Sequence, residues 1–139
     1  MTKLACLTAI VTAAVLAVSP VNIHTAVADE LVCDDEAVKA GKKQFRNCRS
    51  CHKMGDGEKS IGPHLYKIVG RKAADVEGFK YSKAMKKFSL NNVWDVATLD
   101  AFLEKPKKFI KGTRMSFGGI KKESRRADLI CYLKKAGGS

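Results

Sequence analysis

Apolar residues at helical spacing mark the start of the predicted folded region. Acidic residues at positions 34–36 precede Val38, Gly41 and Phe45, which share one face of a helix, and basic residues follow near its end. Gly41 lowers the stability of a helix by ~1 kcal/mol relative to alanine, so we expect another helix to approach it closely. The pattern predicts an N-terminal helix with a packing partner.

Three further stretches predict helices toward the C-terminus. Residues 80–88 read as a short basic helix with apolar positions at Tyr81, Ala84, Met85 and Phe88. The next helix, capped by Asn91 or Asn92 and ended by Pro106, has apolar positions at Trp94, Val96, Leu99, Phe102 and Leu103. Residues 124–136 predict a terminal helix, which Gly137 follows and which can meet Gly41. Helices joined by loops indicate an all-α fold.

Glycine and proline mark two loops between these helices. Residues 52–71 include Gly62-Pro63, and residues 112–119 include Met115 between glycines. A lone methionine in a loop usually contributes only to packing. The first loop follows a segment with two cysteines and a histidine, and the second contains Met115, so both can take part in a functional site.

The N-terminal segment 1–28 has the pattern of a secretory signal. Lys3 precedes an apolar run at 4–18, and Ala26-Val27-Ala28 is a small-residue cleavage site. The run is shorter than the ~20 residues of a spanning helix, although an uncleaved anchor is the alternative. We therefore predict export to the periplasm, removal of residues 1–28, and a single domain at 29–139 without stable membrane insertion.

The chain is strongly basic, with 26 Lys plus Arg against 14 Asp plus Glu and a formal net charge of +12. The electrostatic field of such a charge favours acidic partners. Motifs that stack nucleic-acid bases are missing, so we expect no nucleic-acid partner. Many basic residues flank the Cys-x-x-Cys-His segment or the Met115 loop: Lys42, Lys43, Lys53, Lys105, Lys107, Lys108, Arg114, Lys121 and Lys122. We predict a positive surface there.

The segment Cys48-Arg49-Ser50-Cys51-His52 carries the most specific chemistry. C-x-x-C-H is the attachment signature of a c-type haem, since two thiols one turn apart can bond to the two vinyl groups and the histidine can reach the iron. A zinc site needs two more ligands at matching spacing, and a thioredoxin-like pair needs a β-α-β context. Neither alternative fits the flanking sequence, so one covalently bound haem c is predicted.

The positions of histidine and methionine in the sequence indicate the two axial ligands of the haem iron. His52 is the first ligand, and a backbone carbonyl near Pro63 is expected to accept its Nδ1 proton. Of the four methionines, Met1 lies in the signal, Met54 is too near His52 and Met85 lies in a helical pattern, which leaves Met115 as the second ligand. We expect His64 to be a surface residue.

In its motifs the chain resembles the class I cytochromes c of the bacterial periplasm. The matching segments are Gly41 with Phe45, Gly62–Leu65, Gly70–Lys72, Gly78–Ser82, Trp94, Pro106–Phe109, Gly112–Met115 and Asp128–Leu133. The resemblance implies the small cytochrome c fold, with crossed terminal helices and shorter helices around one haem. It also implies His52 and Met115 as axial ligands, Cys48 and Cys51 as thioethers, and Arg71, Tyr81 and Trp94 near the haem propionates.

The resemblance implies a one-electron carrier and not an enzyme. It also implies that acidic redox partners dock on the positive surface. We expect a monomer that moves electrons between a cytochrome reductase and an oxidase, reaction centre or periplasmic reductase. A haem-based sensor or gas-binding protein, in which Met115 leaves the iron readily, is the alternative.

Two features depart from the family. Phe102 replaces a common tyrosine and Met85 a common asparagine, so we expect a drier haem pocket. Cys33 and Cys131 have no family role: they are either two idle thiols or a disulfide between the terminal helices.

Overall fold

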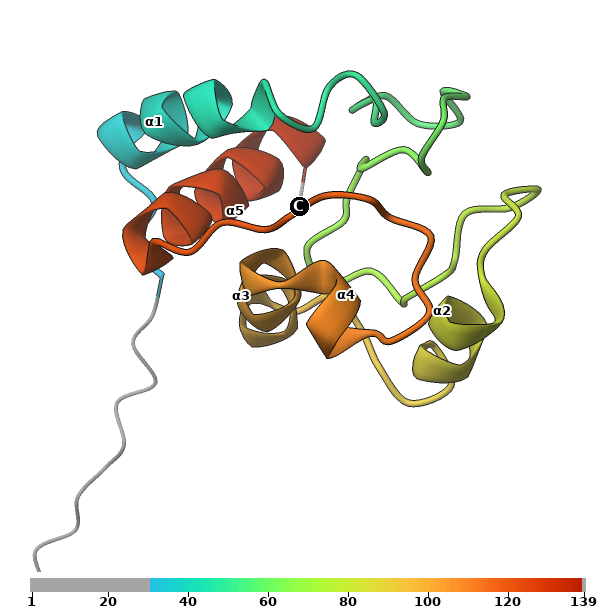
Figure 1. Ribbon diagram of the computed structural model, residues 1–139. Helices are drawn as coiled ribbons and strands as arrows, with labels where there is room; N and C mark the ends of the chain where they lie inside the picture. The colour runs from blue at the N-terminus through green and yellow to red at the C-terminus, as the bar shows by residue number, and fades with distance from the viewer. Residues whose placement is uncertain (1–30, 139) are drawn as a thin grey trace, which may run out of the picture.

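The computed structural model describes residues 31–138 as five helices joined by loops (Figure 1). The helices are α1 (Asp35–Phe45), α2 (Lys83–Phe88), α3 (Val96–Glu104), α4 (Pro106–Phe109) and α5 (Glu123–Gly137). Within these residues the β pairing consists of one isolated bridge between Lys72 and Val93, so the expected all-α fold is confirmed. The predicted signal at 1–28 lies outside the described residues.

Among residues 31–138, no helix is both long enough and apolar enough to cross a membrane.

Helices α1 and α5 lie side by side, and their packing is the main contact between helices (Figure 1). The Asp34 side chain caps α1 by accepting the Ala37 N–H at 2.7 Å. A Cβ atom added to Gly41 would lie 1.9 Å from the Asp128 carbonyl oxygen of α5. The expected close approach at Gly41 is therefore confirmed, and the Phe45 ring packs 5.2 Å from that of Tyr132.

Three helices differ in their boundaries from the sequence prediction. Helix α2 begins at Lys83, because the Ser82 hydroxyl caps it. Helix α3 begins at Val96 with Asp95 as its cap, so the asparagine caps were wrong. The structure ends α5 at Gly137, and Gly138 takes the left-handed conformation with φ 74°.

Trp94 therefore precedes α3 instead of lying in it. Its backbone pairs with the segment at 70–71: Trp94 N–H donates to the Arg71 carbonyl and Gly70 N–H to the Trp94 carbonyl, both at 2.8 Å. Asn92 donates its side-chain amide to the Phe88 carbonyl at 2.7 Å. Hydrogen bonds to distant residues thus hold the segment 92–94 outside the helix, although the spacing of its apolar residues predicted a helix.

Buried Arg126 connects α5 to α3 and to the end of the methionine loop. Its guanidinium donates to both carboxylate oxygens of Asp100, at 2.7 and 2.9 Å. It also donates to the backbone carbonyls of Ile120 and Lys121, at 3.1 and 3.0 Å. Arg126 thereby anchors the point where the segment carrying Met115 joins α5.

Cys33 and Cys131 form a disulfide, with their Cα atoms 5.2 Å apart. The sequence left open whether these two residues are idle thiols or a disulfide, and the structure contains the disulfide. It joins the residues just before α1 to the middle of α5, across 98 residues of sequence.

Ala74 adopts a left-handed backbone conformation, with φ 56°. Alanine pays a steric cost of about 1–2 kcal/mol there, whereas glycine does not. We expect Ala74→Gly to raise the free energy of unfolding by about 0.5 kcal/mol, after the added freedom of the unfolded chain is subtracted. Chemical denaturation measures the change, and Ala97→Gly, at an exposed position in α3, should instead lose about 1 kcal/mol. Equal losses at both positions would contradict the strain at Ala74.

Candidate functional site

The Cys-x-x-Cys-His segment continues the end of α1 as a tight turn. Cys48 N–H donates to the Phe45 carbonyl at 2.8 Å, and the N–H groups of Cys51 and His52 donate to the Cys48 carbonyl at 3.0 and 2.9 Å. Cys48 and Cys51 are free and half-buried. Because one turn separates them, both thiols can serve one edge of a porphyrin.

The His52 imidazole is oriented by the Gly-Pro loop. Its Nδ1 lies 2.7 Å from the Pro63 carbonyl oxygen, which can only accept, so Nδ1 carries the proton and Nε2 is free to bind a metal. The loop is tied back by Gly62 N–H to the Cys51 carbonyl and Leu65 N–H to the Lys53 carbonyl, both at 2.7 Å. The predicted acceptor near Pro63 is confirmed.

Gly62 makes room for this imidazole. A Cβ atom there would lie 2.4 Å from Cε1 of His52 and 2.7 Å from Nδ1. The glycine and proline pattern predicts this loop, but it does not predict that Gly62 makes room for the imidazole of His52. Only a residue without a side chain fits at position 62.

Burial favours the uncharged forms of both the histidine and the first cysteine. It lowers the pKa of His52, and the hydrogen bond to Pro63 only partly opposes this. Burial also raises the pKa of the Cys48 thiol to about 11, with a further contribution from Cys51. At neutral pH the site therefore presents a neutral imidazole and a protonated Cys48 thiol.

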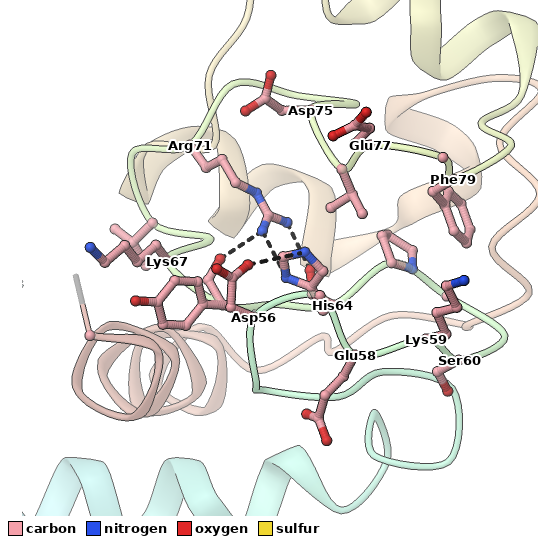
Figure 2. A pocket seen from close by; sticks show the side chains of 18 of the residues that line it. Asp56, Glu58, Lys59, Ser60, His64, Lys67, Arg71, Asp75, Glu77 and Phe79 are labelled. Carbon is pink, nitrogen blue, oxygen red and sulfur yellow. Dashed lines mark hydrogen bonds and ion pairs between the residues drawn. The ribbon is translucent and has the colours of Figure 1, made fainter.

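Arg71 lies beside the Gly-Pro loop and has an unused donor. Its Nη1 donates to the Tyr66 carbonyl at 2.6 Å and its Nη2 to the His64 carbonyl at 2.9 Å (Figure 2). Its Nε is buried and has no partner among the described residues. A buried N–H group of this kind needs an acceptor, and a haem propionate would supply one.

His64 is buried, with 8% of its surface exposed, so its predicted surface position was wrong. Its Nδ1 lies 3.4 Å from Arg71 Nη1, and its Nε2 lies 3.8 Å from a carboxylate oxygen of Asp56 (Figure 2). Sequence spacing could not reveal this, since the three residues meet only after the loop folds back.

Tyr81 lies close enough to Arg71 for their charges to interact. Burial raises the pKa of Tyr81, while the Val76 N–H bond to its hydroxyl, at 3.3 Å, and the charge of Arg71 lower it. The structure thus places Arg71 and Tyr81 near each other, and their role at the haem stays a prediction. The Trp94 backbone pairs with that of Arg71, and its buried ring lies in the core, 4.9 Å from the Phe102 ring.

A wide cavity lies on the flank of this site. Its volume is about 1070 Å³, and its walls come from the segments 56–60 and 75–80, with His64 and Arg71 between them (Figure 2). Cys48, Cys51 and Met115 do not line it. The cavity therefore borders the expected propionate end and is separate from the thiol pair.

Met115 lies half-buried in the loop from α4 to α5 and packs against the core. Its N–H donates to the Thr113 hydroxyl at 3.3 Å, and the Arg114 guanidinium donates to the Lys80 carbonyl. Within residues 31–138 no hydrogen bond engages the Met115 sulfur, so its lone pair is available to a metal. Phe102 is buried among aromatic rings and brings no hydroxyl to this region.

These residues fit a covalently bound haem. Two free thiols lie one turn apart, the imidazole presents Nε2, and Gly62 leaves the space that the ring of His52 occupies. The unpartnered Nε of Arg71 provides a donor for an acidic group. No group of three or more His, Cys, Asp or Glu side chains suited to a metal ion occurs within the described residues.

Comparisons with known proteins agree with this arrangement. The family model described as Cytochrome c matches residues 38–137. Cytochrome c of Trypanosoma brucei brucei is 54% identical over 78 residues, which cover 56% of this chain and 82% of that protein. The structure of cytochrome cH from Methylobacterium extorquens superposes with a TM-score of 0.65 at 39% identity, covering 70% of this chain and 97% of the other.

A longer relative also matches. The cytochrome c-type cyt cy of Rhodobacter capsulatus is 47% identical over 96 residues, covering 68% of this chain. The aligned residues cover only 47% of that relative, so this chain corresponds to about half of its length.

Proposed function

Since this chain belongs to the cytochrome c family, we propose that it is an exported one-electron carrier of the bacterial periplasm. Membership makes it a c-type cytochrome, an electron carrier with covalently bound haem c. The proposed shuttle runs between a cytochrome reductase and an oxidase, reaction centre or periplasmic reductase.

The proposed haem site uses Cys48 and Cys51 as thioethers and His52 and Met115 as axial ligands. The observation that carries this assignment is the turn at Cys48–His52, where the Pro63 carbonyl holds the Nδ1 proton of His52. Arg71 and Tyr81 would hold the propionate end, and Trp94 would support it from the core. An iron with imidazole and thioether ligands supplies reversible one-electron transfer.

An electron carrier is favoured over a sensor or an enzyme by the surroundings of Met115. The loop is held by Arg114 on the Lys80 carbonyl and by Arg126 on the Ile120 carbonyl. A thioether held in this way would serve as a lasting ligand of the haem iron, whereas a gas sensor needs a ligand that leaves readily. The proposed carrier therefore binds no substrate at the iron.

Absorption spectroscopy of the purified protein in both oxidation states tests the proposal. We expect a low-spin spectrum, a weak band near the red edge in the ferric form, and loss of that band in Met115→Ala. An intact mass equal to residues 29–139 plus one haem would support removal of residues 1–28. A colourless mature protein, or a five-coordinate ferrous form that binds carbon monoxide without delay, would contradict the carrier assignment.

Phe102→Tyr is expected to lower the reduction potential by about 30 mV, a roughly threefold change in the equilibrium constant. Phe102 is buried, so its new hydroxyl would sit in the core and favour the more highly charged oxidised form. Redox titration measures the shift. The control is Phe109→Tyr in the same aromatic cluster, where the ring is 40% exposed and its hydroxyl can reach solvent. An unchanged potential in Phe102→Tyr would refute the proposed dry pocket.

The basic surface near α4 is proposed to dock acidic redox partners. Lys105, Lys107 and Lys108 surround a small hollow of about 250 Å³ whose other wall is Phe117 and Gly118. We expect Lys107→Gln with Lys108→Gln to slow electron transfer to an acidic partner about threefold at low salt and to have little effect at high salt. Stopped-flow kinetics measure this, with Lys134→Gln and Lys135→Gln at the end of α5 as the control pair. Equal slowing by both pairs would show a general charge effect instead of a docking surface.

A further inference from the structure

His64 is a buried, titratable side chain that the proposed haem site does not yet use. Two charged groups face its ring from other segments of the chain. The Arg71 guanidinium lies 3.4 Å from Nδ1, and the Asp56 carboxylate lies 3.8 Å from Nε2 (Figure 2). The imidazole therefore lies between a cation and an anion, and each of them constrains where its proton sits.

Arg71 determines the tautomer of His64. A guanidinium has only donors, so Nδ1 of His64 must be the acceptor for Nη1 of Arg71. The single proton of the neutral ring then lies on Nε2, toward the carboxylate of Asp56. The Asp56 side chain is 73% exposed, so this contact is weak compared with a buried ion pair. The neutral imidazole suits both of its neighbours.

His64 also supplies two of the three acceptors that hold the Arg71 guanidinium. Its backbone carbonyl accepts from Nη2 at 2.9 Å, and its ring accepts from Nη1. The Tyr66 carbonyl is the third acceptor, 2.6 Å from Nη1. These contacts orient the guanidinium while its Nε stays buried without a partner among the described residues. The direction of the free Nε–H donor therefore depends on the imidazole.

A proton on Nδ1 of His64 would remove one of these acceptors. The charged imidazole has two donors and no acceptor, so it would turn an N–H toward the N–H groups of Arg71. It would also place a second positive charge 3.4 Å from the guanidinium, while Asp56 remained its acceptor on the other side. Protonation of His64 thus loosens Arg71 and adds one positive charge inside the fold.

Other ionisable groups also line the cavity beside His64. Those from the neighbouring segments are Glu58, Lys59, Lys67, Asp75, Glu77 and Lys80. The Glu58 carboxylate accepts the Gly55 N–H at 2.7 Å, while Asp75 and Tyr81 act on the charge of Arg71. Among all these side-chain types, imidazole is the one that ordinarily changes charge between pH 5 and pH 8. A change over this pH range therefore reports on His64.

We propose that His64 is a positioning residue for the haem: as a neutral acceptor it holds Arg71 so that Nε can donate to a haem propionate, and it releases Arg71 on protonation. The inference rests on the proposed function. A positive charge opposes the more positive oxidised form, so the reduced protein binds this proton more tightly. Each electron received from a redox partner is then accompanied by uptake, at His64, of less than one proton from water.

The test follows the reduction potential from pH 8 to pH 5 in wild type and two variants. His64→Asn keeps a side-chain acceptor near the place of Nδ1 but does not titrate, and His64→Leu has neither property. We expect the wild-type potential to rise as the pH falls, because reduction raises the proton affinity about threefold, which is about 28 mV at 59 mV per tenfold. His64→Asn should match wild type at pH 8 and lose the rise.

His64→Leu should lose the rise and also have a lower potential than His64→Asn at pH 8. Its Arg71 is held less firmly, so the positive charge near the haem opposes oxidation less. NMR of the Arg71 Nε–H gives a readout that needs no electron transfer. Its protection from exchange, measured against free arginine at the same pH, should be higher in wild type and His64→Asn than in His64→Leu. It should fall at pH 5 in wild type but not in His64→Asn.

Asp56→Asn provides an independent test at an exposed position, should the variants at position 64 fail to fold. The carboxylate favours the charged imidazole, so its removal should move the rise in potential to lower pH. An unmoved rise would overturn the inference. So would an equal rise in wild type and His64→Asn, or equal potentials of His64→Asn and His64→Leu at pH 8.

The absorption spectrum separates this inference from the proposed function. A native low-spin spectrum with the weak red-edge band, together with any of these contrary results, would overturn the role of His64 and leave the electron carrier intact. Protein without haem, or without that band, would contradict the proposed function. The protection of the Arg71 Nε–H in wild type, His64→Asn and His64→Leu would then still decide whether the imidazole positions Arg71.

Discussion

Gly41→Ala is expected to lower the free energy of unfolding by about 3 kcal/mol. The new methyl group would lie 1.9 Å from the Asp128 carbonyl oxygen and 2.7 Å from Cβ of Tyr132. Since the nearest atom belongs to the backbone of α5, no side-chain rotation can relieve the clash and the helices must separate. This loss exceeds the ~1 kcal/mol that alanine gains over glycine inside a helix.

Chemical denaturation of the haem-bearing protein measures this effect. The matched control is Gly118→Ala, where an added Cβ atom meets nothing within 4 Å. We expect the control to change stability by less than about 1 kcal/mol. Gly41→Ala with the stability of the control would mean that the α1–α5 crossing is looser than the structure indicates.

Gly62→Ala is expected to displace the His52 imidazole and lower the free energy of unfolding by about 2 kcal/mol. The methyl group would contact the ring at 2.4 to 2.9 Å, so the ring must move and its 2.7 Å hydrogen bond to the Pro63 carbonyl must lengthen or break. Cys48 and Cys51 are not touched by the change. The variant should therefore keep its covalent haem but lose much of the low-spin ferric spectrum.

Absorption and electron paramagnetic resonance spectra of the ferric form report the change at the iron. Ile61→Ala is the control in the same loop, because that side chain is 80% exposed and its truncation should leave both spectrum and stability nearly unchanged. A Gly62→Ala protein with the spectrum of wild type would contradict His52 as the ligand that this loop orients. Loss of covalent haem in Gly62→Ala alone would instead indicate a role in attachment.

Local chemistry explains why much of the site was visible in the sequence. The C-x-x-C-H motif spans five residues, so its geometry follows from one helical turn whatever surrounds it. The Pro63 carbonyl was predicted as the acceptor for His52 because a metal-bound histidine needs one and this loop is the nearest, and the 2.7 Å distance confirms it. Gly41 was identified for a similar reason, since a glycine inside a helix indicates close packing.

The residues that prediction missed depend on contacts between distant segments. Trp94 follows helical spacing, yet its backbone hydrogen bond to Arg71 holds it outside α3. The helix therefore begins one residue later, with Asp95 as its N-cap. His64 resembled a surface residue until the loop brought it between Asp56 and Arg71. In both cases long-range hydrogen bonds outweigh a weak local preference.

The sequence alone determined the all-α class, the haem attachment motif and the orientation of His52, because each depends on spacings of a few residues. The tertiary structure decided which thiols are bonded, where Arg71 keeps an unpartnered donor and why Gly62 must be a glycine. Those properties arise where segments far apart in the sequence meet, and hydrophobic spacing carries no information about such distances.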